Sequence, residues 1–200
     1  MTGERAVDSL RLFVAITVPD AVRKEMLHAQ RELQPLAPRG VVRWTGPGQF
    51  HLTLRFLGDV ASDRVAGLQE SLHTVCSGAP VLQLRAEGVG FFPNARSPRV
   101  IWAGINDGGG RLAALQKEIE RAVQAFTAEP GGERFAGHVT LGRFKRPGHL
   151  EIKALTGRAE TMGTRRFGDW TALEIELIRS ELAPTGAHYT TLDTLPLGEN

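Results

Sequence analysis

Two short segments of the chain carry the same pattern of histidine, apolar residue, threonine and leucine. They are His51-Leu52-Thr53-Leu54 and, 87 residues later, His138-Val139-Thr140-Leu141. An imidazole with an ordinary pKa of about 6.5 titrates near neutral pH, so one histidine of a pair can be neutral while the other is protonated. Such a pair can act as general base and general acid in one displacement, which suits phosphodiester hydrolysis and needs no metal.

Each copy of the motif is predicted to be a strand, because apolar and polar residues alternate in it. Residues two apart in a strand share a face, so His51 and Thr53 point one way and the leucines the other. If the two strands lie side by side, or are related by a pseudo-twofold axis, two His-Thr pairs face one cleft. The threonine hydroxyls would then bind phosphate oxygens. A strained cyclic phosphate is the easiest such substrate, because activated water suffices to open its ring.

The composition is that of an ordinary soluble globular protein, with 42% hydrophobic and 23% charged residues. The 200 residues suffice for a single domain, residues 1–200, with a sizeable core. A net charge of +2 argues against binding to long duplex nucleic acid, whereas a pI near 9.0 allows a local basic patch for an anionic substrate. We also expect a monomer.

Targeting and redox signals are few. Cys76 is the only cysteine, which excludes an intramolecular disulfide and a thiolate metal cluster. A reducing, cytoplasmic location is therefore expected. The first residues include Glu4 and Asp8 and no long apolar run, so we expect neither a signal peptide nor a membrane span.

The elements that must position the motifs follow from periodicity and turn residues. Before the first motif we expect strand 11–18, helix 19–36 and short strand 41–44. The first motif strand, 51–57, is followed by a helix that is capped by Ser62 and runs to 75, and then by strands 81–92 and 99–105. A helix after the glycines at 108–110, the second motif strand and a hairpin of strands 170–182 and 189–195 complete the order. This order predicts an α+β fold that is bilobal, with two pseudo-symmetric antiparallel sheets, flanking helices and a central cleft.

The duplicated motif at this separation resembles the two-histidine (2H) phosphoesterase superfamily. The nearest likeness is to the bacterial and archaeal RNA 2′,3′-cyclic phosphodiesterases, also known as 2′-5′ RNA ligases. Further matching residues are the strand 11–16, Phe56-Leu57-Gly58, Arg143 and, more weakly, Ser180, Gly186 and Tyr189. The resemblance therefore covers residues 11 to about 189.

The resemblance implies hydrolysis of an RNA 2′,3′-cyclic phosphate end to a 2′-phosphomonoester, with no metal or cofactor. It implies that His51 donates a proton to the leaving 3′ oxygen and that His138 activates water. Thr53 and Thr140 would hold the phosphate. Ligation is the reverse reaction of the same site. The near-symmetry of the motifs leaves the roles of the two histidines to the resemblance alone.

The segment Phe135-Ala136-Gly137 departs from the family pattern, which often has a proline just before the second histidine. We expect a difference in the loop and not in the chemistry.

Four other residues near the motifs have two interpretations. Arg143, five residues after His138, falls on the buried face by strict alternation, and reaches the phosphate or base only if Gly142 bends the strand. Arg55 shares the face of the first histidine, or is an exposed strand arginine. Tyr189 either stacks on a base or packs in the core. Phe13 could likewise stack on a base, but core packing is the expectation for it.

Other functions remain open from the sequence. The same site could open ADP-ribose cyclic phosphate or cut 2′-5′ linkages, or the protein could bind RNA ends without turnover. A metal-dependent hydrolase is disfavoured, because the remaining histidines, His28, His73, His149 and His188, have no metal-ligand spacing. The expected partners are RNA ends or cyclic nucleotides, and not a membrane.

Overall fold

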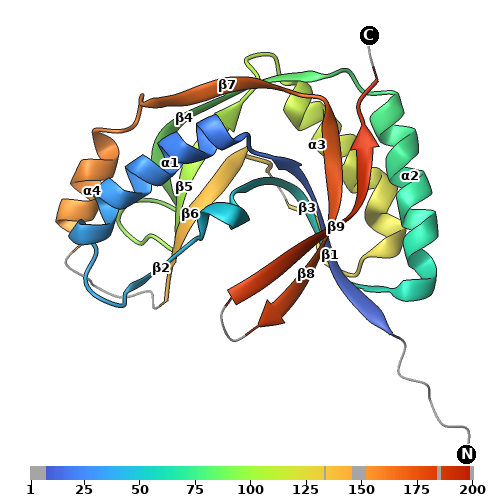
Figure 1. The fold of residues 1–200 in the computed structure, drawn as a ribbon, viewed down its shortest axis with the longest axis horizontal. Coiled ribbons are helices and arrows are strands. Elements are labelled where there is room, and N and C mark those ends of the chain that lie inside the picture. Colours follow the sequence, from blue (N-terminus) through green and yellow to red (C-terminus); the bar gives the residue numbers. More distant parts are fainter. Residues whose placement is uncertain (1–7, 133, 146–151, 184–185, 199–200) are drawn as a thin grey trace, which may run out of the picture.

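The computed structural model describes residues 8–132, 134–145, 152–183 and 186–198, arranged as in Figure 1. These ranges contain four α-helices and nine strands. The helices are α1 (Asp20–Leu33), α2 (Val65–Ser77), α3 (Arg111–Val123) and α4 (Lys153–Glu160). The strands are β1 (Ser9–Thr17), β2 (Val42–Trp44), β3 (His51–Ala61), β4 (Leu82–Phe92), β5 (Val100–Asn106), β6 (His138–Phe144), β7 (Arg166–Ala172), β8 (Glu174–Ala183) and β9 (Gly186–Pro196).

The described strands form one hydrogen-bonded sheet in the order β7-β4-β5-β6-β3-β1-β8-β9, with β2 paired to β6. Neighbouring strands run antiparallel, which confirms the predicted α+β class. Two sheets were predicted, whereas the described strands make a single sheet. The two motif strands join its halves at one residue pair, Leu52 of β3 and Val139 of β6. A sequence pattern predicts strands but not which strands bond, so this junction was not foreseeable.

Helices cover the core side of the sheet in two pairs. Helix α2 packs on α3 and β9, while α1 packs on β7 and α4 (Figure 1). The predicted apolar stripe of α3 is buried at Leu112, Leu115, Ile119 and Val123. Burial of each such side chain is worth about 1.5–3 kcal/mol. Helix α4 was not predicted, because it buries only two residues and its apolar periodicity is correspondingly weak.

The single strand predicted over 170–182 is wrong, because the chain forms two strands there. Strand β7 ends at Ala172 and β8 begins at Glu174, so Leu173 alone connects them. Strand β7 pairs with β4 at one end of the sheet, and β8 pairs with β1 near the other. In Figure 1, β7 arches across the molecule to reach β8. The sequence favours strand on both sides of Leu173, so it does not reveal that the chain crosses from one end of the sheet to the other at this residue.

Two smaller findings complete the fold. Ser62 begins a 3-10 turn (Ser62–Arg64) before α2, and its hydroxyl has no hydrogen-bond partner among the described residues. The predicted cap at Ser62 is therefore wrong. No helix in the described ranges is long and apolar enough to cross a membrane.

Candidate active site

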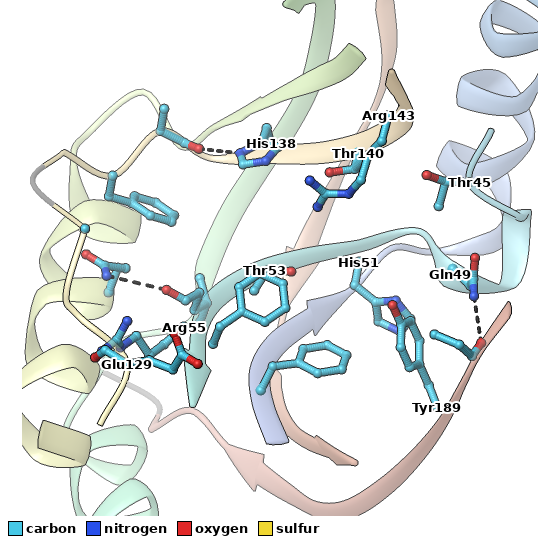
Figure 2. Close-up of a pocket in the computed structure, with 18 of the residues that line it drawn as sticks. Thr45, Gln49, His51, Thr53, Arg55, Glu129, His138, Thr140, Arg143 and Tyr189 are labelled. Carbon is cyan, nitrogen blue, oxygen red and sulfur yellow. Dashed lines mark hydrogen bonds between the residues drawn. The ribbon is translucent and has the colours of Figure 1, made fainter. Parts of the chain in front are cut away.

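A cleft of about 590 Å³ opens on the face of the sheet that carries the polar side chains of both motifs (Figure 2). Strands β1, β2, β3, β6 and β9 contribute to its walls. All six residues that the sequence singled out for the site line this cleft, namely His51, Thr53, His138, Thr140, Arg143 and Tyr189.

The pairing of β3 with β6 sets the geometry of the cleft floor. The residue pair that joins these strands consists of the middle residues of the two motifs, and both side chains are fully buried. Antiparallel register therefore puts His51 across from Thr140, and Thr53 across from His138. Cross-strand neighbours project to the same face. Two imidazoles and two hydroxyls thus meet on one surface.

Each motif strand contains a β-bulge at the leucine that ends the motif. The register of β3 against β1 shifts at Leu54, and that of β6 against β5 shifts at Leu141. One extra residue reverses the alternation of side chains beyond it. As a result Arg55 is buried, while Arg143 is exposed and lines the cleft. The bend expected at Gly142 is supplied by this bulge.

Arg55 was expected either on the face of the first histidine or exposed. It lines the same cleft as His51 but is buried, so the exposed interpretation is wrong. Its side chain is only 8% exposed. Its two terminal nitrogens donate to the carbonyl oxygens of Pro130 at 2.8 Å and Glu129 at 2.6 Å (Figure 2). Its Nε lies 3.1 Å from Oε2 of Glu120, in an ion pair. Arg55 thereby anchors the segment that leads into the second motif.

His138 is held in one tautomer. Its Nδ1 lies 2.8 Å from the carbonyl oxygen of Ala136. A carbonyl oxygen only accepts, so Nδ1 carries the proton and Nε2 of the neutral ring keeps a free lone pair. The ring also meets Phe92 edge to face, with centroids 4.9 Å apart. Burial lowers the pKa of His138, the Ala136 carbonyl raises it, and the Arg143 charge lowers it further.

His51 lies against two aromatic rings. The ring centroid of Tyr189 is 5.4 Å away and that of Phe13 is 6.1 Å away, both in edge-to-face contact. Burial lowers the pKa of His51, whereas the backbone carbonyl of Gln49 and the Glu176 carboxylate raise it. The buried Nδ1 of His51 has no hydrogen-bond partner among the described residues. The Gln49 carbonyl therefore raises the pKa of His51 without forming a hydrogen bond of good geometry with the ring.

The two histidines therefore differ in their charged surroundings. A carboxylate, Glu176, favours the protonated form of His51, although the charge of Arg23 opposes it. A guanidinium, Arg143, favours the neutral form of His138. The motifs are alike in sequence, but their environments separate them in the direction expected for an acid and a base.

Tyr189 packs on the cleft side of β9. It contacts Phe13 edge to face, with centroids 5.0 Å apart, and this pair belongs to a small apolar cluster with Ala15 and Ile178. Phe13 is 3% exposed, as core packing predicted. Burial raises the pKa of Tyr189, while positive charge from β2 and β6 lowers it. Tyr189 thus lines the same cleft as His51 and the two arginines of these strands.

Sequence reasoning missed several residues of the cleft, of which two are informative. Arg43 on β2 lines it, and so does Gln49, whose Nε2 donates to the Ala187 carbonyl at 2.7 Å and ties the loop before the first motif to β9. The signal for Arg43 was its central place in a short predicted strand. Its partner strand could not be read from the sequence.

Among the other histidines that the structure describes, His28, His73 and His188 do not line the cleft. His28 pairs with Glu25, and His73 pairs with Asp193. His149 lies outside the described residues. Within the described ranges, no three His, Cys, Asp or Glu side chains are grouped as a metal site would require. Independence from metal stays a prediction.

Comparison with known proteins identifies the family. The family model described as LigT like Phosphoesterase matches residues 16–102. A protein of Archaeoglobus fulgidus named RNA 2′,3′-cyclic phosphodiesterase is 31% identical over 183 residues, covering 92% of this chain and 98% of its own length. A Thermus thermophilus protein of the same name is 31% identical over 196 residues, covering 94% and 90%.

Solved structures agree with this relationship. The crystal structure of TT0787 from Thermus thermophilus has a TM-score of 0.77 at 30% identity, over 96% of this chain and 100% of that one. Escherichia coli LigT complexed with 3′-AMP has a TM-score of 0.74 at 23% identity, over 95% and 99%, and so shares the fold. Relatives of this identity over nearly the whole length show that the chain belongs to the LigT-like family of 2H phosphoesterases.

Proposed function

We propose that the protein hydrolyses RNA 2′,3′-cyclic phosphate ends to 2′-phosphomonoesters. One observation carries the proposal: two histidine-threonine pairs from adjacent antiparallel strands line a single cleft. An acid and a base on one floor suit displacement at one phosphorus. The names of the relatives agree, since those of Archaeoglobus fulgidus and Thermus thermophilus are called RNA 2′,3′-cyclic phosphodiesterase.

His138 is the general base in this mechanism. Its Nε2 has a free lone pair because Nδ1 is committed to the Ala136 carbonyl. Nε2 takes a proton from water as the water oxygen bonds to phosphorus. The bond from phosphorus to the 3′ oxygen breaks, and protonated His51 gives its proton to that oxygen. The 2′ oxygen keeps the phosphate, so the product is a 2′-phosphomonoester and a 3′-hydroxyl.

Polar groups around the histidines hold the phosphate. Thr53 and Thr140 share the floor and donate hydrogen bonds to its non-bridging oxygens. Arg143 adds a positive charge that stabilises the additional negative charge of the transition state. Tyr189 borders the first histidine and positions the nucleoside. In ligation an RNA 5′-hydroxyl replaces water as the nucleophile: His138 takes its proton, the 5′ oxygen bonds to phosphorus, and the bond to the 3′ oxygen breaks as His51 protonates that oxygen. A 2′-5′ linkage results, and the same acid-base pair can run this step in the opposite direction.

The test is hydrolysis of an oligonucleotide with a 2′,3′-cyclic phosphate, in the presence of a chelator. The wild type is compared with His51→Ala and His138→Ala, and the position of the product phosphate is determined. We expect a 2′-phosphate from the wild type and at least about 100-fold slower turnover in each variant. Activity abolished by the chelator, or untouched by either substitution, contradicts the mechanism.

A further inference from the structure

Two arginines lie directly opposite one another at one end of the cleft. Arg43 of β2 pairs in register with Arg143 of β6, and both side chains line the cleft. Cross-strand partners in an antiparallel pair have Cβ atoms roughly 4.5–5.5 Å apart, and like charges in that position repel. The chain therefore places two positive charges together at a stability cost.

No carboxylate offsets this pair within the part of the chain that the structure describes. Neither guanidinium lies within 4.0 Å of an Asp or Glu oxygen there. Other arginines of the protein do have such partners, as Arg85 has Asp169 at 2.8 Å. The cleft therefore contains two neighbouring positive charges that no described carboxylate neutralises by direct contact.

The strand pair that carries the two arginines is fixed by a buried side chain. Gln30 of α1 is 2% exposed, and its Nε2 donates to the carbonyl oxygens of Thr45 at 2.7 Å and Leu141 at 2.9 Å. These two residues lie just beyond Arg43 and just before Arg143 in the chain. The backbone nitrogen of Thr45 also donates to the Leu141 carbonyl at 2.9 Å. The backbone itself therefore holds the two charged residues side by side.

The arginine pair lies beside the catalytic floor. Arg143 acts electrostatically on His138, and both arginines act on Tyr189, which contacts His51. Strands β2 and β3 both pair with the edge of β6 opposite β5, β3 at Val139 and β2 at residues 142–144. The arginine pair thus lies farther along β6 than the histidine floor. An anion held between the two arginines would be separate from the reacting phosphate.

We propose that Arg43, together with Arg143, binds the phosphate on the 5′ oxygen of the terminal nucleoside. This inference rests on the proposed function, because that phosphate is the next one along an RNA chain from its cyclic end. Guanidinium groups suit it, since they bind phosphate through paired, charge-assisted hydrogen bonds. The site thereby selects RNA ends and 5′-phosphorylated nucleotides over nucleosides that have only the cyclic phosphate.

The kinetic test uses adenosine 2′,3′-cyclic phosphate with either a 5′-hydroxyl or a 5′-phosphate. The measured quantity is the ratio of kcat/KM for the two substrates. We expect the wild type to prefer the 5′-phosphate by roughly tenfold or more, as one charge-assisted contact allows. Arg43→Gln brings the ratio towards one, and Arg43→Lys keeps part of it. Arg31→Gln, an exposed arginine on α1 outside the cleft, serves as the control and keeps the wild-type ratio.

A binding measurement separates this inference from the proposed function. Calorimetry compares adenosine 2′,5′-bisphosphate with adenosine 2′-monophosphate on wild type and Arg43→Gln. Tighter binding of the bisphosphate that Arg43→Gln abolishes supports the second phosphate site even if neither cyclic substrate is turned over. An equal loss for both ligands or both substrates means that Arg43 serves the reacting phosphate, and overturns the inference. A wild type with no preference in either assay also overturns it.

Discussion

Leu52 and Val139 pair across the centre of the sheet, and each is the middle residue of a His-x-Thr motif. Both side chains are fully buried, so the core fixes the one contact at which β3 and β6 join. The catalytic floor is the opposite face of that contact. Packing on one side of the sheet therefore determines the spacing of the two histidines on the other.

The surroundings of the histidines predict the pH profile of kcat/KM. The rate falls at low pH as the base gains a proton, and at high pH as the acid loses one. Burial lowers the pKa of both histidines from 6.5, so the optimum lies on the acid side of that value. Arg143→Gln removes a charge that lowers the pKa of His138, so the acid limb moves to higher pH. Glu176→Gln removes a charge that raises the pKa of His51, so the alkaline limb moves to lower pH.

These profiles are measured with a cyclic-phosphate substrate at constant ionic strength. They also test which histidine is the acid. If the roles were exchanged, Glu176→Gln would move the acid limb and Arg143→Gln the alkaline limb. Movement of neither limb would mean that these charges do not act on the histidines.

Removal of either motif hydroxyl is expected to slow the chemical step. Thr53→Val and Thr140→Val keep the side-chain shape and delete one hydrogen-bond donor to the phosphate. We expect kcat to fall about 100-fold in each, the typical cost of one transition-state donor. Single-turnover rates and melting temperatures measure the effect. Thr191→Val, an exposed β9 residue, is the matched control. A loss in melting temperature that parallels the loss in rate would indicate a structural role instead.

Arg55 is expected to matter for stability. Arg55→Met leaves two carbonyl oxygens and the Glu120 carboxylate without their donor. We expect the free energy of unfolding to fall by about 2–4 kcal/mol, because charged hydrogen bonds of buried groups are lost. Denaturant titration measures this, with Arg31→Met at an exposed position as the control. An unchanged midpoint would refute the anchoring role.

Gly137 is expected to tolerate no side chain. A Cβ there would lie 2.5 Å from the carbonyl oxygen of Ile105 and 3.1 Å from Cδ2 of Leu112. Gly137→Ala must therefore displace the strand that begins at His138, and a misplacement of about 1 Å can cost on the order of 100-fold in rate. The measurements are kcat and melting temperature. Gly157→Ala on α4, where a Cβ meets nothing within 4 Å, should keep the wild-type rate. Equal rates in the two variants would show that the close contact relaxes freely.

The same contact explains the departure from the family pattern before the second motif. A proline at this position would bring a Cβ to the same carbonyl oxygen. The glycine and the close approach of β5 belong together in this chain. The sequence reveals the missing proline, but only the structure reveals the neighbour that requires glycine.

Alternation alone predicted the motif side chains and failed just beyond them. Leu52 and Leu54 are buried while His51 and Thr53 face the cleft, as a period of two requires. The same rule did not predict that Arg55 is buried, because a bulge adds one residue whose presence depends on the neighbouring strand. Sequence periodicity describes one strand at a time, so it cannot predict a bulge, which arises in the pairing of two strands.

Register explains the other omissions. Arg43 stood in a correctly predicted short strand, but its importance comes from lying opposite Arg143. The β7–β8 crossing at Leu173 was hidden for a similar reason, since both strands have ordinary strand sequences. The roles of the histidines stay a prediction from the family resemblance, and Glu176 raises the pKa of His51 while Arg143 lowers that of His138, as those roles would require.

The crossing at Leu173 has a consequence for how the protein is made. Strand β1 is synthesised first, but its neighbour β8 comes near the end of the chain, and β4 gains its outer neighbour β7 only just before that. Both halves of the sheet therefore keep an open edge until β7 and β8 have left the ribosome. Such open edges can pair with other chains, and long-range pairings form slowly. We infer that this nascent chain depends on protection during translation more than a protein whose halves are finished one after the other.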